Sequence, residues 1–142
     1  MIAASMSSPS SGRVLVADND LHVAQVLRIF LERAGLAVEH ALDGGAAHAR
    51  IAAGGVDALI CDLDMPVLSG EALIARLERE AAGGVVPQVF VISGYLDHAL
   101  EGRLRRSPLV REVLRKPFDL ASFAQRVVAW VHPRDADATA CE

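Results

Sequence analysis

Apolar runs of strand length alternate with longer amphipathic segments from residue 13 to residue 132. The runs cover about 13–17, 37–42, 56–61, 87–92 and 110–114. Short runs rich in Val, Leu and Ile, separated by segments of helix length, are typical of a parallel sheet that is buried on both faces. The run at 37–42 contains Glu39 and His40, so we expect it to lie near an edge of the sheet.

Five amphipathic segments follow these runs and predict helices, because apolar residues recur in them at three- and four-residue spacing. Residues that can cap a helix start precede four of them, namely Asp20, Asp43, Ser69 and Asp119. The fourth helix is predicted to begin at about residue 96. The last is expected to direct Leu120, Phe123, Val127, Trp130 and Val131 toward the core. Alternating strands and helices with right-handed crossovers predict a doubly wound α/β sandwich.

Isolated polar side chains end four of the runs: Asp18, Asp62, Ser93 and Lys116, which is the only lysine of the chain. Parallel sheets of this kind bind ligands at the carboxyl ends of their strands. If the four runs lie side by side, two carboxylates, a hydroxyl and an ammonium meet at one point. Such a set suits a divalent cation and a phosphoryl group. Taken singly, each aspartate or serine is more often a helix cap or turn former than a functional residue.

Composition narrows the class of protein. With 142 residues and 52% hydrophobic content, the chain is long enough for one domain with a sizeable core. The formal net charge is −4 and the arginines are spread along the chain, which disfavours nucleic acid as a direct ligand. The five histidines are scattered, and we expect all of them at the surface.

The two cysteines and the termini indicate where the protein resides. Cys61 lies within an apolar run and Cys141 near the end, which predicts a reducing compartment rather than a disulfide framework. No uncharged stretch is long enough to span a bilayer and no signal peptide is evident, so we expect a cytoplasmic protein without membrane contact. Residues 1–12 are expected to form a flexible leader, 13–132 the folded domain and 133–142 a disordered tail.

Four segments carry the polar residues in a characteristic order. They are 15–20 (LVADND), 59–66 (LICDLDMP) with Gly70, 91–94 (VISG) and 116–118 (KPF). Together they resemble the CheY-like receiver domain of two-component response regulators over about residues 13–132. The resemblance implies a flavodoxin-like fold with five parallel strands in the order 2-1-3-4-5 and a cis bond between Lys116 and Pro117. It also implies a phosphorylated signalling domain rather than an enzyme, with self-dephosphorylation as its only turnover.

By the same resemblance, Asp62 is the phosphoacceptor, which takes a phosphoryl group from the phosphohistidine of a sensor histidine kinase or a histidine phosphotransfer protein. Asp18, Asp62 and the main-chain carbonyl of Asp64 would hold Mg²⁺. Lys116 would pair with carboxylate and phosphoryl oxygens, and the Ser93 hydroxyl would move to the phosphoryl group. The chemistry needs these parts, because a carboxylate that attacks a phosphoryl group requires cations to neutralise the negative charge.

The chain departs from the family pattern at two positions. Asn19 stands where a second acid is usual; it can still orient a metal-bound water, but one negative charge is lost, which predicts weaker Mg²⁺ binding unless Asp20 points inward. Val113 stands where a switching Tyr or Phe is frequent. Either the site is coupled differently to the face made by the fourth helix and the fifth strand, or phosphorylation controls another face. Asp64 and Tyr95 flank the site, where we expect them to influence the lifetime of the phosphoryl group.

Three alternatives compete with a phosphorylated receiver. Asn19 and Val113 are compatible with a degenerate receiver that only binds proteins. The segment 62–64 also fits the Asp-x-Asp signature of haloacid-dehalogenase-type (HAD-type) phosphatases, although no suitable acidic pair follows Lys116. A flavodoxin-like cofactor binder would need a loop rich in Gly, Ser or Thr where 18–20 reads DND. The receiver could act alone or belong to a hybrid kinase, and we expect an unidentified protein as its downstream partner.

Overall fold

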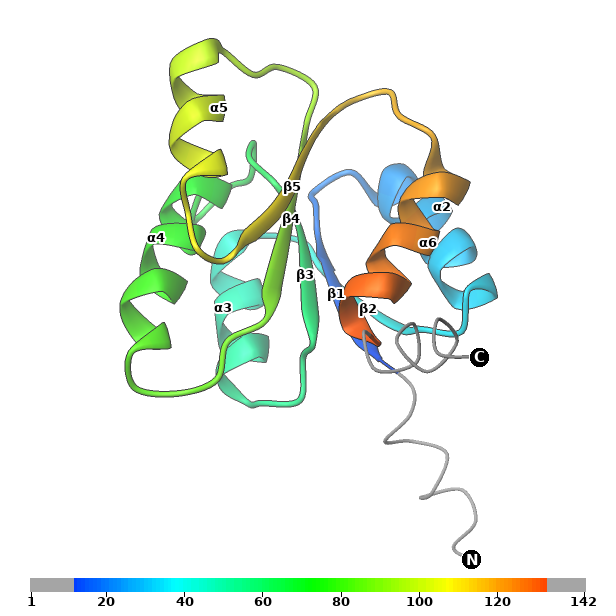
Figure 1. The fold of residues 1–142 in the computed structure, drawn as a ribbon, viewed down its shortest axis with the longest axis horizontal. Coiled ribbons are helices and arrows are strands. Elements are labelled where there is room, and N and C mark those ends of the chain that lie inside the picture. Colours follow the sequence, from blue (N-terminus) through cyan, green and yellow to red (C-terminus); the bar gives the residue numbers. More distant parts are fainter. Residues whose placement is uncertain (1–11, 133–142) are drawn as a thin grey trace, which may run out of the picture.

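The computed structural model describes residues 12–132, which form one five-stranded parallel sheet with helices on both faces (Figure 1). In chain order the elements are β1 (Arg13–Ala17), α2 (Leu21–Arg33), β2 (Ala37–Ala41), α3 (Gly44–Ala52), β3 (Ala58–Asp62), α4 (Gly70–Ala81), β4 (Gln88–Ser93), α5 (His98–Arg105), β5 (Val110–Arg115) and α6 (Leu120–Val131). The strand order is β2-β1-β3-β4-β5. The predicted doubly wound fold and the 2-1-3-4-5 order are therefore confirmed.

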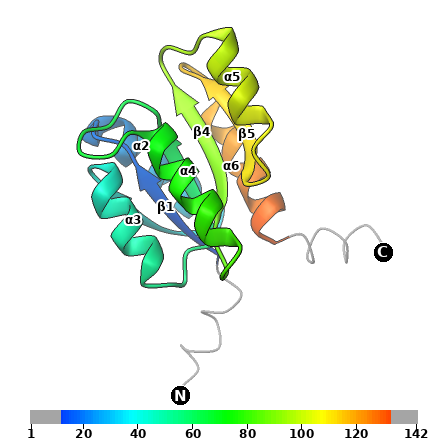
Figure 2. The same cartoon turned by 90° about the vertical axis from the view of Figure 1, so that its left-hand side faces the viewer.

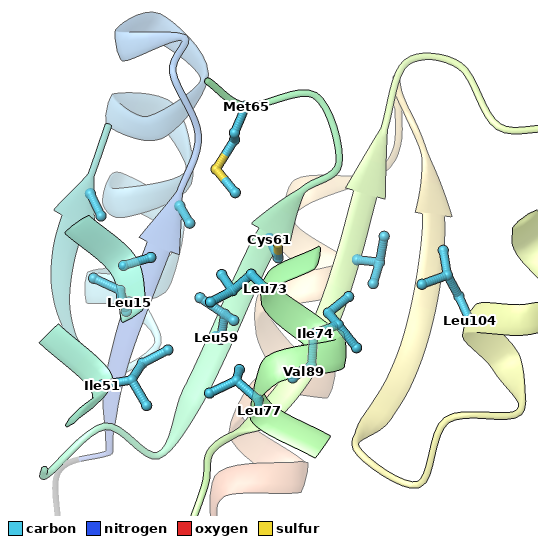
Figure 3. Close-up of a cluster of buried hydrophobic side chains, with 14 of the residues drawn as sticks. Leu15, Ile51, Leu59, Cys61, Met65, Leu73, Ile74, Leu77, Val89 and Leu104 are labelled. Carbon is cyan, nitrogen blue, oxygen red and sulfur yellow. The ribbon is translucent and has the colours of Figure 1, made fainter. Parts of the chain in front are cut away.

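Two hydrophobic cores lie on opposite faces of the sheet, because successive side chains of a strand point to opposite sides. Helices α3, α4 and α5 cover one face, which is turned toward the viewer in Figure 2, and α2 and α6 cover the other. Leu15 and Leu59 of the sheet and Leu73 and Leu77 of α4 belong to the first core (Figure 3). This sandwich leaves the carboxyl edge of the sheet free of helices and open to ligands.

The strand that carries polar residues, β2, lies at an edge of the sheet. The predicted edge strand β2 pairs only with β1, and its Glu39 carboxylate accepts hydrogen bonds from Arg13 and Arg50. Hydrogen bonds from Arg50 and then from Arg13 lower the pKa of Glu39 to about 2. A fixed charge on an exposed edge discourages pairing with a strand of another chain.

Helix starts follow the predicted caps, with one correction. Asp20, Asp43, Ser69 and Asp119 each accept a hydrogen bond from a backbone N–H of the first helical turn, as predicted. However, α5 begins at His98 rather than at residue 96, because Asp97 is extended and its side chain accepts from the Leu100 N–H. Leu96 therefore precedes the helix, and its side chain is buried in the core.

The prediction for Trp130 is wrong. Its side chain is 40% exposed, whereas Phe123, Ala124 and Val127 form the buried side of α6. The guanidinium of Arg111 lies 5.0 Å from the centre of the indole ring, and the Trp130 carbonyl accepts a hydrogen bond from Gln88 Nε2. A cation over the ring shields it from water without bringing it into the core.

The predicted termini lie outside the described residues except for Gly12. Its carbonyl accepts a hydrogen bond from Ala37 N at 2.8 Å. In the part of the chain that the structure describes, no helix combines the length and the apolar character needed to cross a membrane.

Candidate functional site

The predicted polar residues meet in a pocket at the carboxyl edge of the sheet. Within residues 12–132, the buried polar side chains are those of Asp18, Asp62 and Ser93, with exposed fractions of 0%, 6% and 3%. Asp62 and Ser93 line an open cavity of about 540 Å³ together with Lys116. Because dehydrating polar groups costs free energy, three of them buried at one place indicate a site rather than a packing device.

Lys116 joins the two buried carboxylates. Its Nζ lies 3.3 Å from Asp18 Oδ2 and 3.2 Å from Asp62 Oδ2. The second oxygen of each carboxylate accepts a backbone N–H two residues further along the chain, from Asp20 at 2.9 Å and from Asp64 at 3.1 Å. Each carboxylate is therefore held by one ammonium and one amide. Both are thus oriented before any ligand binds.

The electrostatic balance of the pocket favours a cation. Burial, reinforced by the Asp62 charge, raises the pKa of Asp18 above its ordinary value, although the Asp20 N–H and Lys116 act in the opposite direction. Burial lowers the pKa of Lys116, but Asp62 and Asp18 outweigh it and the net direction is upward, so this side chain stays charged. Two carboxylates against one ammonium leave an excess of negative charge when both aspartates are ionised.

The donor set fits Mg²⁺ rather than a cation with many protein ligands. In the described range, no three His, Cys, Asp or Glu side chains converge as a complete metal-binding group. Asp18 and Asp62 supply two oxygen donors, and the open side of the cavity leaves room for water and phosphate. Mg²⁺ typically takes one or two carboxylates and retains water or phosphate oxygens.

Asn19 and Asp20 line the same cavity but differ in their contacts. Asn19 is exposed. The Asp20 side chain caps α2, because its Oδ1 accepts hydrogen bonds from the N–H groups of His22 and Val23. One oxygen of Asp20 is therefore engaged in the helix start.

Ser93 is turned toward its own loop. Its hydroxyl donates to the Tyr95 carbonyl at 2.6 Å and accepts from the Tyr95 N–H at 3.1 Å. The Ser93 carbonyl accepts from Lys116 N, which ties the ends of β4 and β5 together. Tyr95 is 83% exposed, and Val113 is buried in the core beneath this edge. The tyrosine is therefore a surface residue in this conformation.

The segment after Asp62 leaves little space for side chains where it packs against the end of β3. A Cβ at Gly70 would lie 2.6 Å from the Asp62 carbonyl oxygen and 2.7 Å from Leu63 Cα, so only glycine fits there. Val67 has a φ of 69°, in the left-handed region that β-branched residues avoid. The bond between Lys116 and Pro117 is cis, as predicted.

His40 is the residue near the site that sequence reasoning missed. It is half-buried rather than at the surface, and its Nε2 lies 2.7 Å from the Asp18 carbonyl oxygen. The signal was available, because the 2-1-3-4-5 order places the end of the second strand beside the first. His40 stands near that end.

The comparisons with known proteins agree with this fold. The family model of the response regulator receiver domain matches residues 14–128, and the chain belongs to this family. Among the relatives is the transcriptional regulatory protein PrrA of Mycobacterium leprae, 34% identical over 130 residues, which cover 92% of this chain and 54% of that protein. The chain thus spans about half the length of this relative.

Solved structures of receiver domains share the fold. The signal receiver domain of a putative Luxo repressor protein from Vibrio parahaemolyticus has a TM-score of 0.79 at 17% identity, with 92% of this chain and 97% of that chain covered. The Francisella response regulator 1452 receiver domain has a TM-score of 0.72 at 26% identity, with 87% and 99% covered. The protein is therefore a CheY-like receiver domain of two-component signal transduction.

Proposed function

We propose that this receiver accepts a phosphoryl group on Asp62 from the phosphohistidine of a sensor histidine kinase or histidine phosphotransfer protein, with Mg²⁺ as cofactor. In this transfer the P–N bond of the phosphohistidine breaks and a P–O bond to the Asp62 carboxylate forms. The observation that carries the proposal is the convergence of the buried Asp18 and Asp62 carboxylates on Lys116 Nζ, at 3.3 and 3.2 Å.

Each residue of the pocket has a defined task in this proposal. Asp18, Asp62 and the main-chain carbonyl of Asp64 would hold Mg²⁺, with Asn19 orienting a metal-bound water. When bound, Mg²⁺ would neutralise phosphoryl oxygens and so lower the repulsion between the phosphoryl group and Asp62. Lys116 supplies a fixed positive charge beside the attacking oxygen. The Ser93 hydroxyl can donate to a phosphoryl oxygen only after it releases the Tyr95 carbonyl.

The output route of this receiver passes through a polar contact rather than an aromatic ring. Val113 has no ring to rotate. Arg115 instead donates to the Leu96 carbonyl at 2.7 Å and to Glu101 Oε1 at 2.8 Å, so it joins the loop after Ser93 to α5. Release of the Ser93 hydroxyl would shift this loop and pull on Arg115. The proposed signal therefore reaches α5 through Arg115.

Phosphoramidate tests the transfer because its P–N bond mimics that of phosphohistidine. With Mg²⁺, the wild type should gain the mass of one phosphoryl group in a form that hydroxylamine removes, as expected for an acyl phosphate, and Asp62→Asn should not. Asp57→Asn is the control, because Asp57 is an exposed carboxylate that accepts from Arg13 N at the opposite end of the sheet. An unlabelled wild type would support the degenerate, protein-binding receiver. Sustained hydrolysis of a phosphate ester would support the phosphatase alternative.

Beryllofluoride with Mg²⁺ tests the output route, because it mimics a bound phosphoryl group. Amide hydrogen exchange in α5 should change on its addition to the wild type but not to Arg115→Gln, while both bind it equally. Arg103→Gln is the control, since Arg103 pairs with Glu71 of α4 and does not contact the loop after Ser93. An unchanged response of α5 in Arg115→Gln would contradict this route.

A further inference from the structure

The side chain of His40 holds the main chain of the acidic turn. Its Nε2 lies 2.7 Å from the carbonyl oxygen of Asp18. A carbonyl oxygen can only accept a hydrogen bond, so the Nε2–H of His40 must be the donor. The backbone N–H of Asp18 donates in turn to the Ala41 carbonyl at 3.1 Å. Two consecutive residues of β2 therefore hold both main-chain polar groups of Asp18.

This hydrogen bond determines the orientation of the peptide between Asp18 and Asn19. The Asp18 side chain is already fixed by Lys116 and by the Asp20 N–H. The turn that carries Asn19 begins directly after the hydrogen bonds that join β1 to β2. The carbonyl of Asp18 is the first main-chain polar group of this turn. Without a donor from the protein, this peptide could rotate, and Asn19 and the Asp20 N–H would move with it.

Packing holds the His40 ring in place. His40 lies on the same side of β2 as Val38, beneath α2, where Ala24, Gln25 and Arg28 line a small hollow with it. Arg28 donates from Nη2 to the Val38 carbonyl at 2.7 Å, which fixes the neighbouring part of the strand. The ring is half-buried between a strand and a helix, so its hydrogen bond to Asp18 costs little additional ordering.

We propose that His40 is a positioning residue that preorganises the acidic turn for Mg²⁺. This inference rests on the proposed function. Asn19 leaves the pocket one carboxylate short of the usual family pattern, so less of the affinity for the cation can come from charge. More of it then depends on donors that are already in place before the metal arrives. Groups that orient metal ligands without touching the metal typically contribute 10- to 100-fold to affinity.

Isothermal titration of the full chain with MgCl₂ alone tests this role. His40→Val should raise the dissociation constant about tenfold. His40→Gln should recover much of the affinity, because an amide N–H can donate to the same carbonyl. His48→Ala should match the wild type, although it loses a histidine hydrogen bond of similar length, 2.8 Å to Glu80. If His40 had a purely structural role, its substitution would lower the melting temperature of the metal-free protein. The Val and Gln variants would then not differ in their affinity for Mg²⁺.

The outcomes separate this inference from the proposed function. Equal dissociation constants for the wild type and His40→Val overturn the role of His40 and leave the proposed Mg²⁺ site intact. If the wild type does not bind Mg²⁺, or if Asp18→Asn does not abolish that binding, the proposed site itself fails. The role of His40 then fails with it. His40→Gln also guards against misfolding, since tight binding by a folded Gln variant and weak binding by a folded Val variant would attribute the loss to the missing donor rather than to the removal of the imidazole ring.

Discussion

Replacing Asp18 with asparagine should make the metal-free protein more stable and remove its response to Mg²⁺. The Asp18 side chain is fully buried, and its carboxylate competes with that of Asp62 for the single ammonium of Lys116. Asparagine is nearly the same size and keeps an oxygen that can accept the Asp20 N–H. The substitution therefore removes one buried charge while most of the packing stays.

The magnitude follows from the distances. Asp18 Oδ2 and Asp62 Oδ2 lie 3.3 and 3.2 Å from Lys116 Nζ, so they are no further apart than the sum, 6.5 Å. At an effective dielectric constant of about 20, they repel by about 2.6 kcal/mol or more, and Lys116 attracts Asp18 by about 5 kcal/mol. Removing the carboxylate from water costs several kcal/mol, which offsets that net attraction. Because burial raises the pKa of Asp18, the charged form is the less favourable one in the fold.

The expected gain for Asp18→Asn is about 1 kcal/mol in the free energy of unfolding at pH 7, or about 4 °C in melting temperature. In the wild type, Mg²⁺ at 100 times its dissociation constant should add about 2.7 kcal/mol, and in the variant nothing. The order of stability of the two proteins therefore reverses when EDTA is replaced by saturating Mg²⁺. Urea unfolding followed by circular dichroism measures both quantities, with Asp57→Asn as the control.

The dependence on pH checks the cause. A raised pKa means that the folded state binds the Asp18 proton more tightly than the unfolded state does. As the pH falls through this raised pKa, Asp18 of the folded wild type becomes protonated and loses its buried charge. The difference in the free energy of unfolding between Asp18→Asn and the wild type should therefore shrink. The reasoning is refuted if the variant is less stable than the wild type in EDTA, or if Mg²⁺ stabilises both equally.

Three further substitutions test the surroundings of the site by urea unfolding. Gly70→Ala should cost roughly 2–3 kcal/mol, because its Cβ would lie 2.6 Å from a backbone oxygen, whereas Gly84→Ala meets nothing within 4 Å and should be nearly neutral. Val67→Gly should gain about 1 kcal/mol by relieving a φ of 69°, a gain that the exposed Val85→Gly should lack. Glu39→Gln should lose about 1 kcal/mol at pH 7, since its ion pairs are partly exposed. That loss should vanish as the pH falls toward 2, because the Glu39 pKa is about 2 in the folded state and a depressed pKa contributes stability only above it. A loss for Glu39→Gln that is independent of pH would contradict the ion-pair explanation.

Most of the fold was predictable because its determinants are local. Apolar runs separated by helix-length segments predict the strands, and Asp20, Asp43, Ser69 and Asp119 predict helix starts, since a cap bonds only to its own first turn. Errors arose where two distant elements compete for a residue. Trp130 has the helical spacing of a core residue, yet Arg111 of β5 covers it at the surface.

The convergence of the four polar residues was predictable from the sequence, but their individual contacts were not. Asp18, Asp62, Ser93 and Lys116 end strands that lie side by side, so an α/β sheet has to gather them. The direction of the Ser93 hydroxyl, the left-handed conformation of Val67 and the contact of Arg115 with the Leu96 carbonyl could not be read from spacing. They depend on hydrogen bonds between loops whose relative positions only the packed sheet determines.

The sequence by itself determined that this chain is a doubly wound α/β domain with two acids, a hydroxyl and a lysine at the strand ends, because hydrophobic periodicity and the position of polar residues are properties of the chain alone. Only the tertiary structure decided how these groups are held. It brought Lys116 within 3.3 Å of both carboxylates and placed His40, from an edge strand, against the carbonyl of Asp18. Hydrogen bonds between residues that are 22 to 98 positions apart in the chain exist only after the sheet has formed, and they orient the groups that line the pocket.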